Sequence, residues 1–227
     1  MNTEKKETRC PTVTAHAGCM ELPDNSIEAM EAGVAAGATI VEFDLRFTPE
    51  GRPILSHDAP TGDVVMLEDV LAFLRRHPGV RANVDVKDLA GLAAVPALAK
   101  RYGVLERLFY TGLVADRIPI AREKSPEIPY YLNTDVEEDP DAPSAADGQA
   151  IYEALAQKTK ALGAVGVNLH HSHLTEGLVA ACRKAGLLVS VWTVTDPAAI
   201  ARVLPLRPDN ITTRRPDLVL AAMKESD

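Results

Sequence analysis

Short runs rich in β-branched residues recur along the chain, and each ends in polar residues before an Ala- and Leu-rich stretch begins. Runs of this length and composition are typical of buried β-strands. They lie at residues 12–17, 39–45, 82–87, 107–113, 128–133, 165–170, 187–194 and 210–213. The pattern therefore predicts eight strands.

Most of the stretches between these runs show apolar residues at helical spacing. They cover residues 26–36, 67–76, 89–102, 147–162, 175–185 and 197–204. Side chains that can accept a free amide at a helix start are Asn25, Thr175 and Asp196. Glycines stand where three of the helices should end, at Gly103, Gly163 and Gly186.

Strand and helix alternate along the whole chain without a central break. This alternation predicts one domain over residues 1–227, with the α/β architecture of a (β/α)8 TIM barrel. An open, doubly wound sheet is the alternative. Residues 1–11 are expected to form a flexible N-terminal segment, and the acidic residues 135–147 a surface loop.

The composition narrows the class of protein. The chain has 227 residues, is 46% hydrophobic and has a net charge of -8, which supports a sizeable core and argues against a nucleic-acid binder. Its cysteines, Cys10, Cys19 and Cys182, match no zinc motif and are interpreted as reduced thiols. The polar N-terminus lacks the apolar stretch of a signal peptide, and no apolar run could span a membrane. We therefore expect a cytoplasmic protein.

Carboxylates gather at the ends of the predicted strands. Glu42 and Asp44 lie two positions apart on one strand, and Asp85 lies on the next strand of the barrel series. The carboxyl ends of the strands meet at one rim of an α/β barrel, so these side chains should converge. A hard divalent cation, Mg²⁺ or Ca²⁺, would relieve their repulsion. Ion pairs with Arg46 and Lys87 are the structural alternative.

Two histidines are placed near these carboxylates. His16 ends the first strand, and His57 follows the short run PIL. Because imidazole titrates near neutral pH, the two could serve as general acid and general base at a metal-bound phosphate. Another group of histidines, at positions 170, 171 and 173, has no matching carboxylate, and we interpret it as a polar loop that lines the mouth of the barrel instead of a metal site.

These residues resemble the glycerophosphodiester phosphodiesterase family of phospholipase C-like barrels. In that family a first-strand His-Arg-Gly is followed by Glu-Asn-Thr or Glu-Asn-Ser, then Glu-x-Asp, then His-Asp. The corresponding residues here are His16-Ala17-Gly18, Asp24-Asn25-Ser26, Glu42-Phe43-Asp44 and His57-Asp58. Downstream, NVDVK resembles the family's Glu-x-Lys strand, and SVWTV and NITTRRPDL resemble its last two strands.

The resemblance implies roles for the matching positions. Glu42, Asp44 and Asp85 would hold the metal, and His16 and His57 would form the acid/base pair. Three further residues would serve the substrate: Lys87 would contact the phosphate, Asn25 would support the site at the first helix start, and Trp192 would form an apolar wall.

The chain also departs from the family pattern. Ala17 replaces the arginine after the first histidine, and Arg46 is our hypothesis for a substitute in substrate binding. Asp85 stands for a glutamate. The segment between His57 and the helix beginning LEDVLAF is much shorter than in typical members. The resemblance therefore does not determine the leaving group of the substrate or specificity for glycerol.

Together these features predict a metal-dependent phosphodiesterase that converts small glycerophosphodiesters into an alcohol and glycerol phosphate. A phosphodiester lyase or phospholipase D-like enzyme acting on another head group is one alternative. A degenerate barrel that only binds phosphorylated ligands is another. No nucleic-acid partner and no transmembrane segment are expected.

Overall fold

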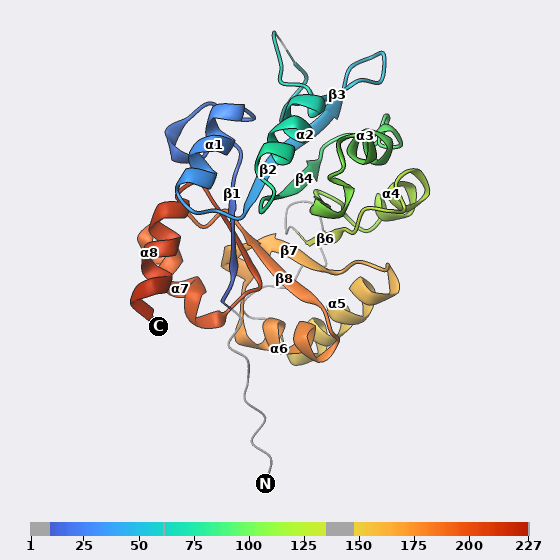
Figure 1. The fold of residues 1–227 in the computed structure, drawn as a ribbon. Coiled ribbons are helices and arrows are strands. Elements are labelled where there is room, and N and C mark those ends of the chain that lie inside the picture. Colours follow the sequence, from blue (N-terminus) through green and yellow to red (C-terminus); the bar gives the residue numbers. More distant parts are fainter. Residues whose placement is uncertain (1–9, 61, 135–147, 227) are drawn as a thin grey trace.

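The computed structural model describes residues 10–60, 62–134 and 148–226. Parallel strands form a central barrel with helices on its outside (Figure 1). These strands are β1 (Thr12–Ala15), β2 (Ile40–Phe47), β4 (Arg81–Val86), β5 (Leu108–Thr111), β6 (Tyr131–Thr134), β7 (Gly166–His170), β8 (Leu188–Trp192) and β9 (Asn210–Thr213). Their order around the sheet is β5-β4-β2-β1-β9-β8-β7-β6.

The barrel closes between β5 and β6. Tyr110 and Tyr130 form a parallel bridge there. The Tyr110 amide donates to the Pro129 carbonyl over 2.9 Å, and the Asn133 amide donates to the Leu113 carbonyl over 2.8 Å. These contacts join the two ends of the strand order, and so the predicted (β/α)8 barrel is confirmed and the open sheet is excluded.

The outer layer among the described residues consists of α1 (Ile27–Ala35), α2 (Leu67–Arg76), α3 (Ala94–Tyr102), α4 (Ile118–Lys124), α5 (Gln149–Ala161), α6 (Glu176–Lys184), α7 (Pro197–Val203) and α8 (Pro216–Ser226). Short 3-10 turns lie at Cys19–Glu21, Leu105–Arg107, His171–His173 and Leu204–Leu206. The sequence pattern had not indicated α4 or α8. It also started the third helix too early, because residues 90–93 form a turn before α3. No helix among the described residues combines the length and apolar character that crossing a bilayer requires.

One strand lies outside the parallel series. The strand β3 (Pro53–Leu55) pairs antiparallel with the end of β2, with Leu45 opposite Leu55. The hairpin lengthens the wall of the barrel at its carboxyl rim. His57 follows directly after β3 and is therefore delivered to this rim by a hairpin and not by a barrel strand.

The alternation of side chains along each strand separates two environments. On β2, the side chains of Val41, Phe43 and Leu45 belong to the core that packs against the helices. The intervening positions face the barrel interior, where Ile40 belongs to a separate apolar cluster with Phe109 and Tyr131. The ionisable residues lie further along the same strands, toward their carboxyl ends.

The helix boundaries confirm most of the capping signals. The side chains of Thr175 and Asp196 accept amides at the starts of α6 and α7, whereas Asn25 does not cap α1. Ser26 is the N-cap there and accepts from the Ala29 amide over 3.1 Å. Asn25 instead adopts a φ of 60°, which turns its side chain toward β2. The three predicted glycine stops have positive φ at Gly103, Gly163 and Gly186.

The predicted loop 135–147 and most of the predicted N-terminal segment 1–11 lie outside the described residues.

Candidate active site

The three predicted metal ligands meet at the carboxyl rim. Strands β2 and β4 are adjacent and parallel, with Asp44 opposite Asp85 and Glu42 opposite Asn83. One carboxylate oxygen from each of Glu42, Asp44 and Asp85 lies within 4.8 Å of the others. The register between two neighbouring strands thus brings together residues that are about 40 positions apart in the chain.

The charges in this cluster do not balance. The Lys87 ammonium lies 2.6 Å from Asp85 Oδ2 and 3.2 Å from Asp44 Oδ1. Burial by itself would lower the pKa of Lys87, but Asp85 and Asp44 together raise it above its usual value. Three carboxylates beside one ammonium leave two negative charges. This oxygen-only donor set with two excess charges fits a hard divalent cation.

Glu42 carries most of the electrostatic penalty. Its side chain is buried, and its Oε2 accepts a hydrogen bond from the Ala17 amide over 2.8 Å. Burial, reinforced by the charges of Asp44 and Asp85, raises the pKa of Glu42 well above its usual value. The alternative interpretation, in which Arg46 and Lys87 form ion pairs with the carboxylates, is only half correct. Lys87 pairs with Asp44 and Asp85, whereas Arg46 donates to a backbone carbonyl.

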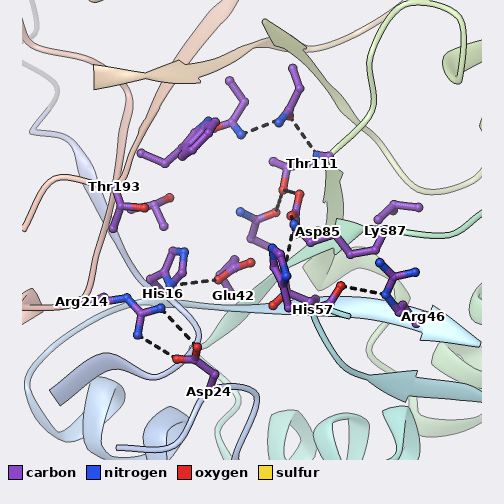
Figure 2. A pocket seen from close by; sticks show the side chains of 18 of the residues that line it. His16, Asp24, Glu42, Arg46, His57, Asp85, Lys87, Thr111, Thr193 and Arg214 are labelled. Atoms are coloured by element: carbon purple, nitrogen blue, oxygen red, sulfur yellow. Dashed lines mark hydrogen bonds and ion pairs between the residues drawn. The ribbon is translucent and has the colours of Figure 1, made fainter. Parts of the chain in front are cut away.

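His16 follows β1 and lies beside Glu42 (Figure 2). Its Nδ1 lies 2.8 Å from the Ala17 carbonyl and 3.9 Å from Glu42 Oε2. A carbonyl can only accept, so Nδ1 carries the proton in the neutral ring and Nε2 keeps a free lone pair. Burial lowers the pKa of His16, which favours this neutral form.

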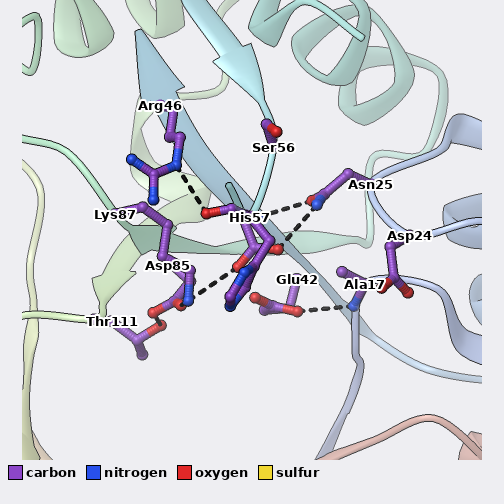
Figure 3. Close-up of polar contacts among 12 residues, drawn as sticks. Ala17, Asp24, Asn25, Glu42, Arg46, Ser56, His57, Asp85, Lys87 and Thr111 are labelled. Carbon is purple, nitrogen blue, oxygen red and sulfur yellow. Dashed lines mark hydrogen bonds and ion pairs between the residues drawn. The ribbon is translucent and has the colours of Figure 1, made fainter. Parts of the chain in front are cut away.

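His57 lies on the other side of Glu42 in the same view (Figure 2). Its side chain is 65% exposed, and its Nδ1 lies 3.2 Å from Asp58 Oδ1. Two contacts fix the backbone around it. Arg46 Nε donates to the His57 carbonyl over 2.8 Å (Figure 3), and Ser56 Oγ donates to the Asp58 carbonyl over 2.7 Å. The hairpin therefore holds an otherwise exposed imidazole at the rim.

A cavity of about 670 Å³ opens at this rim. Eight of the nine predicted site residues line it, namely His16, Glu42, Asp44, Arg46, His57, Asp85, Lys87 and Trp192. A space of this size with convergent polar groups is typical of a small-molecule site.

Asn25 is the predicted site residue that does not line this cavity. Its Nδ2 donates to Asp44 Oδ2 and its Oδ1 accepts from the Asp44 amide, both over 2.9 Å. Asn25 therefore lies behind Asp44 and fixes the orientation of that carboxylate. The two dashed lines at Asn25 in Figure 3 are these hydrogen bonds. The left-handed backbone at Asn25 makes this double contact possible.

The second histidine group does not line the cavity, contrary to the expectation of a loop at its mouth. His170 Nδ1 contacts Ser172 Oγ over 2.7 Å, and His171 Nδ1 contacts Arg202 over 2.6 Å. None of the three histidines lines the cavity, and among the described residues the only group with metal-ligand spacing is the carboxylate cluster. His170 does pack edge-on against Trp192, with ring centroids 5.5 Å apart.

The structure adds residues that the sequence analysis had not assigned to the site. Arg214, Asp24, Arg117, Asn83, Thr111 and Thr193 also line the cavity. Strand alternation could have indicated two of them, because Asn83 lies two positions before Asp85 and Arg214 two positions after Thr212. Thr111 is the last residue of β5, whereas Asp24, Arg117 and Thr193 lie outside the strands and required the folded loops.

Comparisons with known proteins agree with this geometry. The profile of the glycerophosphoryl diester phosphodiesterase family matches residues 16–90 and 63–218. Glycerophosphodiester phosphodiesterase 1 of Bos taurus is 34% identical over 59 residues, which is 26% of this chain and 18% of that protein. The Homo sapiens protein of the same name is 35% identical over 54 residues, 24% of this chain and 16% of its own length. These alignments thus span under a fifth of either relative.

Solved structures match over much more of the chain. An Oleispira antarctica phosphodiesterase, in complex with the product sn-glycerol-3-phosphate, has a TM-score of 0.78 at 18% identity and covers 95% of this chain and 97% of its own. A glycerophosphodiester phosphodiesterase from Parabacteroides distasonis has a TM-score of 0.76 at 19% identity, covering 96% and 99%. Such low identities show a shared fold, and the family profile spans most of the chain. The chain belongs to the glycerophosphoryl diester phosphodiesterase family.

Proposed function

We propose that this protein is a divalent-cation-dependent phosphodiesterase that hydrolyses glycerophosphodiesters to an alcohol and a glycerol phosphate. The observation that carries the proposal is the convergence of Glu42, Asp44 and Asp85 in a cavity that His16 and His57 also line. Membership of the family supports it, as does the Oleispira antarctica relative, which was solved with glycerol phosphate as its product.

Glu42, Asp44 and Asp85 would hold the cation, Mg²⁺ or Ca²⁺. When bound, the cation supplies a Lewis acid that offsets charge on the phosphate oxygens. Asn25 keeps Asp44 in place through its two hydrogen bonds. Lys87, held between Asp44 and Asp85, presents its remaining N–H to the cavity and contacts the phosphate.

His16 is suited to act as the general base. Its Nδ1 proton is held by the Ala17 carbonyl, so Nε2 can take a proton from the attacking oxygen. That oxygen belongs either to water or to a neighbouring hydroxyl of the substrate. The second route gives a cyclic phosphate first.

His57 then acts as the general acid. The Asp58 carboxylate, 3.2 Å from Nδ1, can accept from that nitrogen and orient the ring, which leaves Nε2 to give a proton to the departing alkoxide. Arg46 holds the His57 backbone in position, and Trp192 provides a wall against the alcohol portion of the substrate.

A phosphodiester lyase is the second candidate. The chain passes from His57 to the start of α2 at Leu67 with no further domain between them. The site is therefore open beside His57, and a substrate hydroxyl could replace water as the nucleophile. A persistent cyclic phosphate would identify the lyase, and glycerol phosphate would identify the hydrolase.

The test is a panel of glycerophosphodiesters assayed with Mg²⁺ and with Ca²⁺, with products identified by phosphorus NMR. We expect activity that excess chelator abolishes. His16→Ala and His57→Ala should each lower kcat by about 10²- to 10⁴-fold, which is typical for loss of a general acid or base. His173→Ala, a histidine outside the cavity, is the matched control and should retain full activity.

Full activity in excess chelator would contradict the proposed dependence on a divalent cation. Unchanged kcat in both cavity histidine variants would contradict their roles. No turnover of any diester with either metal would contradict the proposed activity as a whole.

A further inference from the structure

The phosphate site lacks one expected contact. Ala17 follows His16 where the family resemblance places an arginine, so no guanidinium comes from the end of β1. The sequence analysis suggested Arg46 as the substitute. In the structure, however, Arg46 Nε donates to the His57 carbonyl over 2.8 Å. An arginine that keeps this bond cannot use Nε in a two-pronged contact with phosphate.

Arg214 occupies the position beside His16. Strand β9 pairs in parallel with β1, with Thr12 opposite Asn210 and Thr14 opposite Thr212. Continuing this register by two residues sets Arg214 opposite His16, and the side chains of both line the cavity. Figure 2 shows the guanidinium of Arg214 next to the His16 ring, on the side away from Arg46.

The Arg214 side chain is anchored at one end. Its Nη1 donates to Asp24 Oδ1 over 2.8 Å and to the Gly18 carbonyl over 3.3 Å, and its Nη2 donates to Asp24 Oδ2 over 3.4 Å. Gly18 is required for this arrangement. It has a φ of 71°, and a Cβ there would lie 1.8 Å from Asp24 Oδ1 and 2.8 Å from Arg214 Nη1.

The anchoring leaves a specific pair of donors free. A guanidinium has five N–H groups. The contacts above use both on Nη1 and one on Nη2, which leaves the Nε proton and the second Nη2 proton without a partner among the described residues. These two protons point in the same direction along one edge of the planar group. That edge matches two oxygens of a phosphate.

We propose that Arg214 binds the phosphate of the substrate through its Nε and Nη2 edge, and so replaces the arginine that the chain lacks at position 17. The inference rests on the proposed function, since it assigns a phosphate contact within that site. Arg214 has a second effect on its neighbour: after burial, its charge is a further cause of the lowered pKa of His16. The same cation thus favours the neutral imidazole.

The direct test measures binding of inorganic phosphate by isothermal titration calorimetry in MgCl₂. Losing a charge-assisted, two-pronged contact should weaken binding about 10- to 100-fold in Arg214→Ala. Arg214→Lys keeps the positive charge but lacks the paired Nε and Nη2 donors, so we expect its phosphate affinity to lie between those of Arg214→Ala and the wild type. Arg46→Ala tests the alternative arginine and should weaken phosphate binding less than Arg214→Ala does. Arg202→Ala, on α7 and outside the cavity lining, is the matched control, and its phosphate affinity should stay within about threefold of the wild type.

A second variant addresses the anchor. Asp24→Asn keeps Arg214 but removes the charge that orients it, and should weaken phosphate binding less than Arg214→Ala does. Circular dichroism and thermal melting establish that each variant is folded. Removal of Arg214 takes a partner from the half-exposed Asp24 and from the Gly18 carbonyl but leaves the hydrophobic core unchanged, so we expect folded protein.

Two results would overturn the inference: an unchanged phosphate affinity in folded Arg214→Ala, or a loss in Arg46→Ala as large as in Arg214→Ala. If diesters are turned over, Arg214→Ala should also raise KM more than it lowers kcat. If no diester is turned over, the proposed function fails, whereas the phosphate titration still decides the role of Arg214.

Discussion

At the residue scale, Glu42 shows how the site works against the stability of the fold. Its carboxylate is buried on a barrel strand, faces Asp44 and Asp85, and has the Ala17 amide as its hydrogen-bond donor. Lys87 compensates Asp44 and Asp85 but has no contact with Glu42 within ion-pair distance among the described residues. The charged form of Glu42 is therefore disfavoured until a cation binds, as its raised pKa indicates.

This predicts that Glu42→Gln stabilises the metal-free protein. The amide keeps an oxygen for the Ala17 amide but removes a buried charge, so the free energy of unfolding at pH 8 in excess chelator should rise by about 1 kcal/mol or more. Urea denaturation gives this quantity. Saturating Mg²⁺ should cancel the advantage, because only the wild type gains the full binding free energy of the cation. A less stable Glu42→Gln in chelator would show that the carboxylate is compensated by other means.

At the element scale, the β2–β3 hairpin positions His57. The hairpin turns at Gly51, whose amide donates to the Thr48 carbonyl over 2.8 Å, while the Thr48 amide donates to the Arg52 carbonyl over 2.9 Å. Gly51 has a φ of 81°, a conformation that strains any residue with a Cβ. The connection that follows β3 then carries His57 and Asp58 to the rim. The exposed imidazole thus depends on a turn that is remote from the chemistry.

We expect Gly51→Ala to lower the free energy of unfolding by about 1–2 kcal/mol through backbone strain alone, since no atom lies within 4 Å of the added Cβ. Gly79→Ala is the matched control. Gly79 also has open space around its Cβ site, but its φ lies outside the left-handed region, so the substitution should be neutral or stabilising by under about 1 kcal/mol. Thermal melts of the two variants provide the comparison. Equal changes in stability for Gly51→Ala and Gly79→Ala would contradict the role of backbone strain at Gly51.

At the scale of the whole molecule, the barrel is closed at the seam between β5 and β6. Tyr110 lies at this seam, fully buried, and its hydroxyl forms a 2.9 Å hydrogen bond with Ser125 Oγ at the end of α4. Burial raises the pKa of Tyr110, so this bond joins two neutral hydroxyls. The hydrogen bond therefore connects α4 in the outer layer to the seam between β5 and β6, and closure of this seam completes the barrel wall around the cavity.

Tyr110→Phe should lower the free energy of unfolding by about 1–2 kcal/mol, because it leaves the buried Ser125 hydroxyl without its partner. The double variant Tyr110→Phe, Ser125→Ala removes both polar groups and should be less destabilised than Tyr110→Phe alone. Urea denaturation followed by tryptophan fluorescence and by circular dichroism measures both. A double variant whose loss equals the sum of the two single losses would contradict the coupling.

The sequence by itself determined the class of fold and the chemistry of the rim. Strand alternation placed Glu42 and Asp44 on one side of β2, and the order of β2 and β4 in the barrel brought Asp85 to them. These features are local or follow from the rule that active sites form at the carboxyl ends of barrel strands. The helix α4 was missed because its seven residues are too few for a periodic pattern, whereas α8 starts at Pro216 and has apolar residues at helical spacing that the sequence analysis did not use.

Only the tertiary structure decided which cation lies beside His16. Arg46 and Arg214 are both arginines at strand ends, and nothing in their local sequence separates them. The closing of β9 against β1 sets Arg214 beside His16, while the hairpin engages Arg46 with the His57 carbonyl. The tertiary structure also shows that Ser26 caps α1 in place of Asn25 and that Asn25 contacts Asp44, which gives a specific partner to the supporting role that the resemblance implied. Such partners come from segments distant in the chain, and their pairing depends on packing geometry that local propensity does not encode.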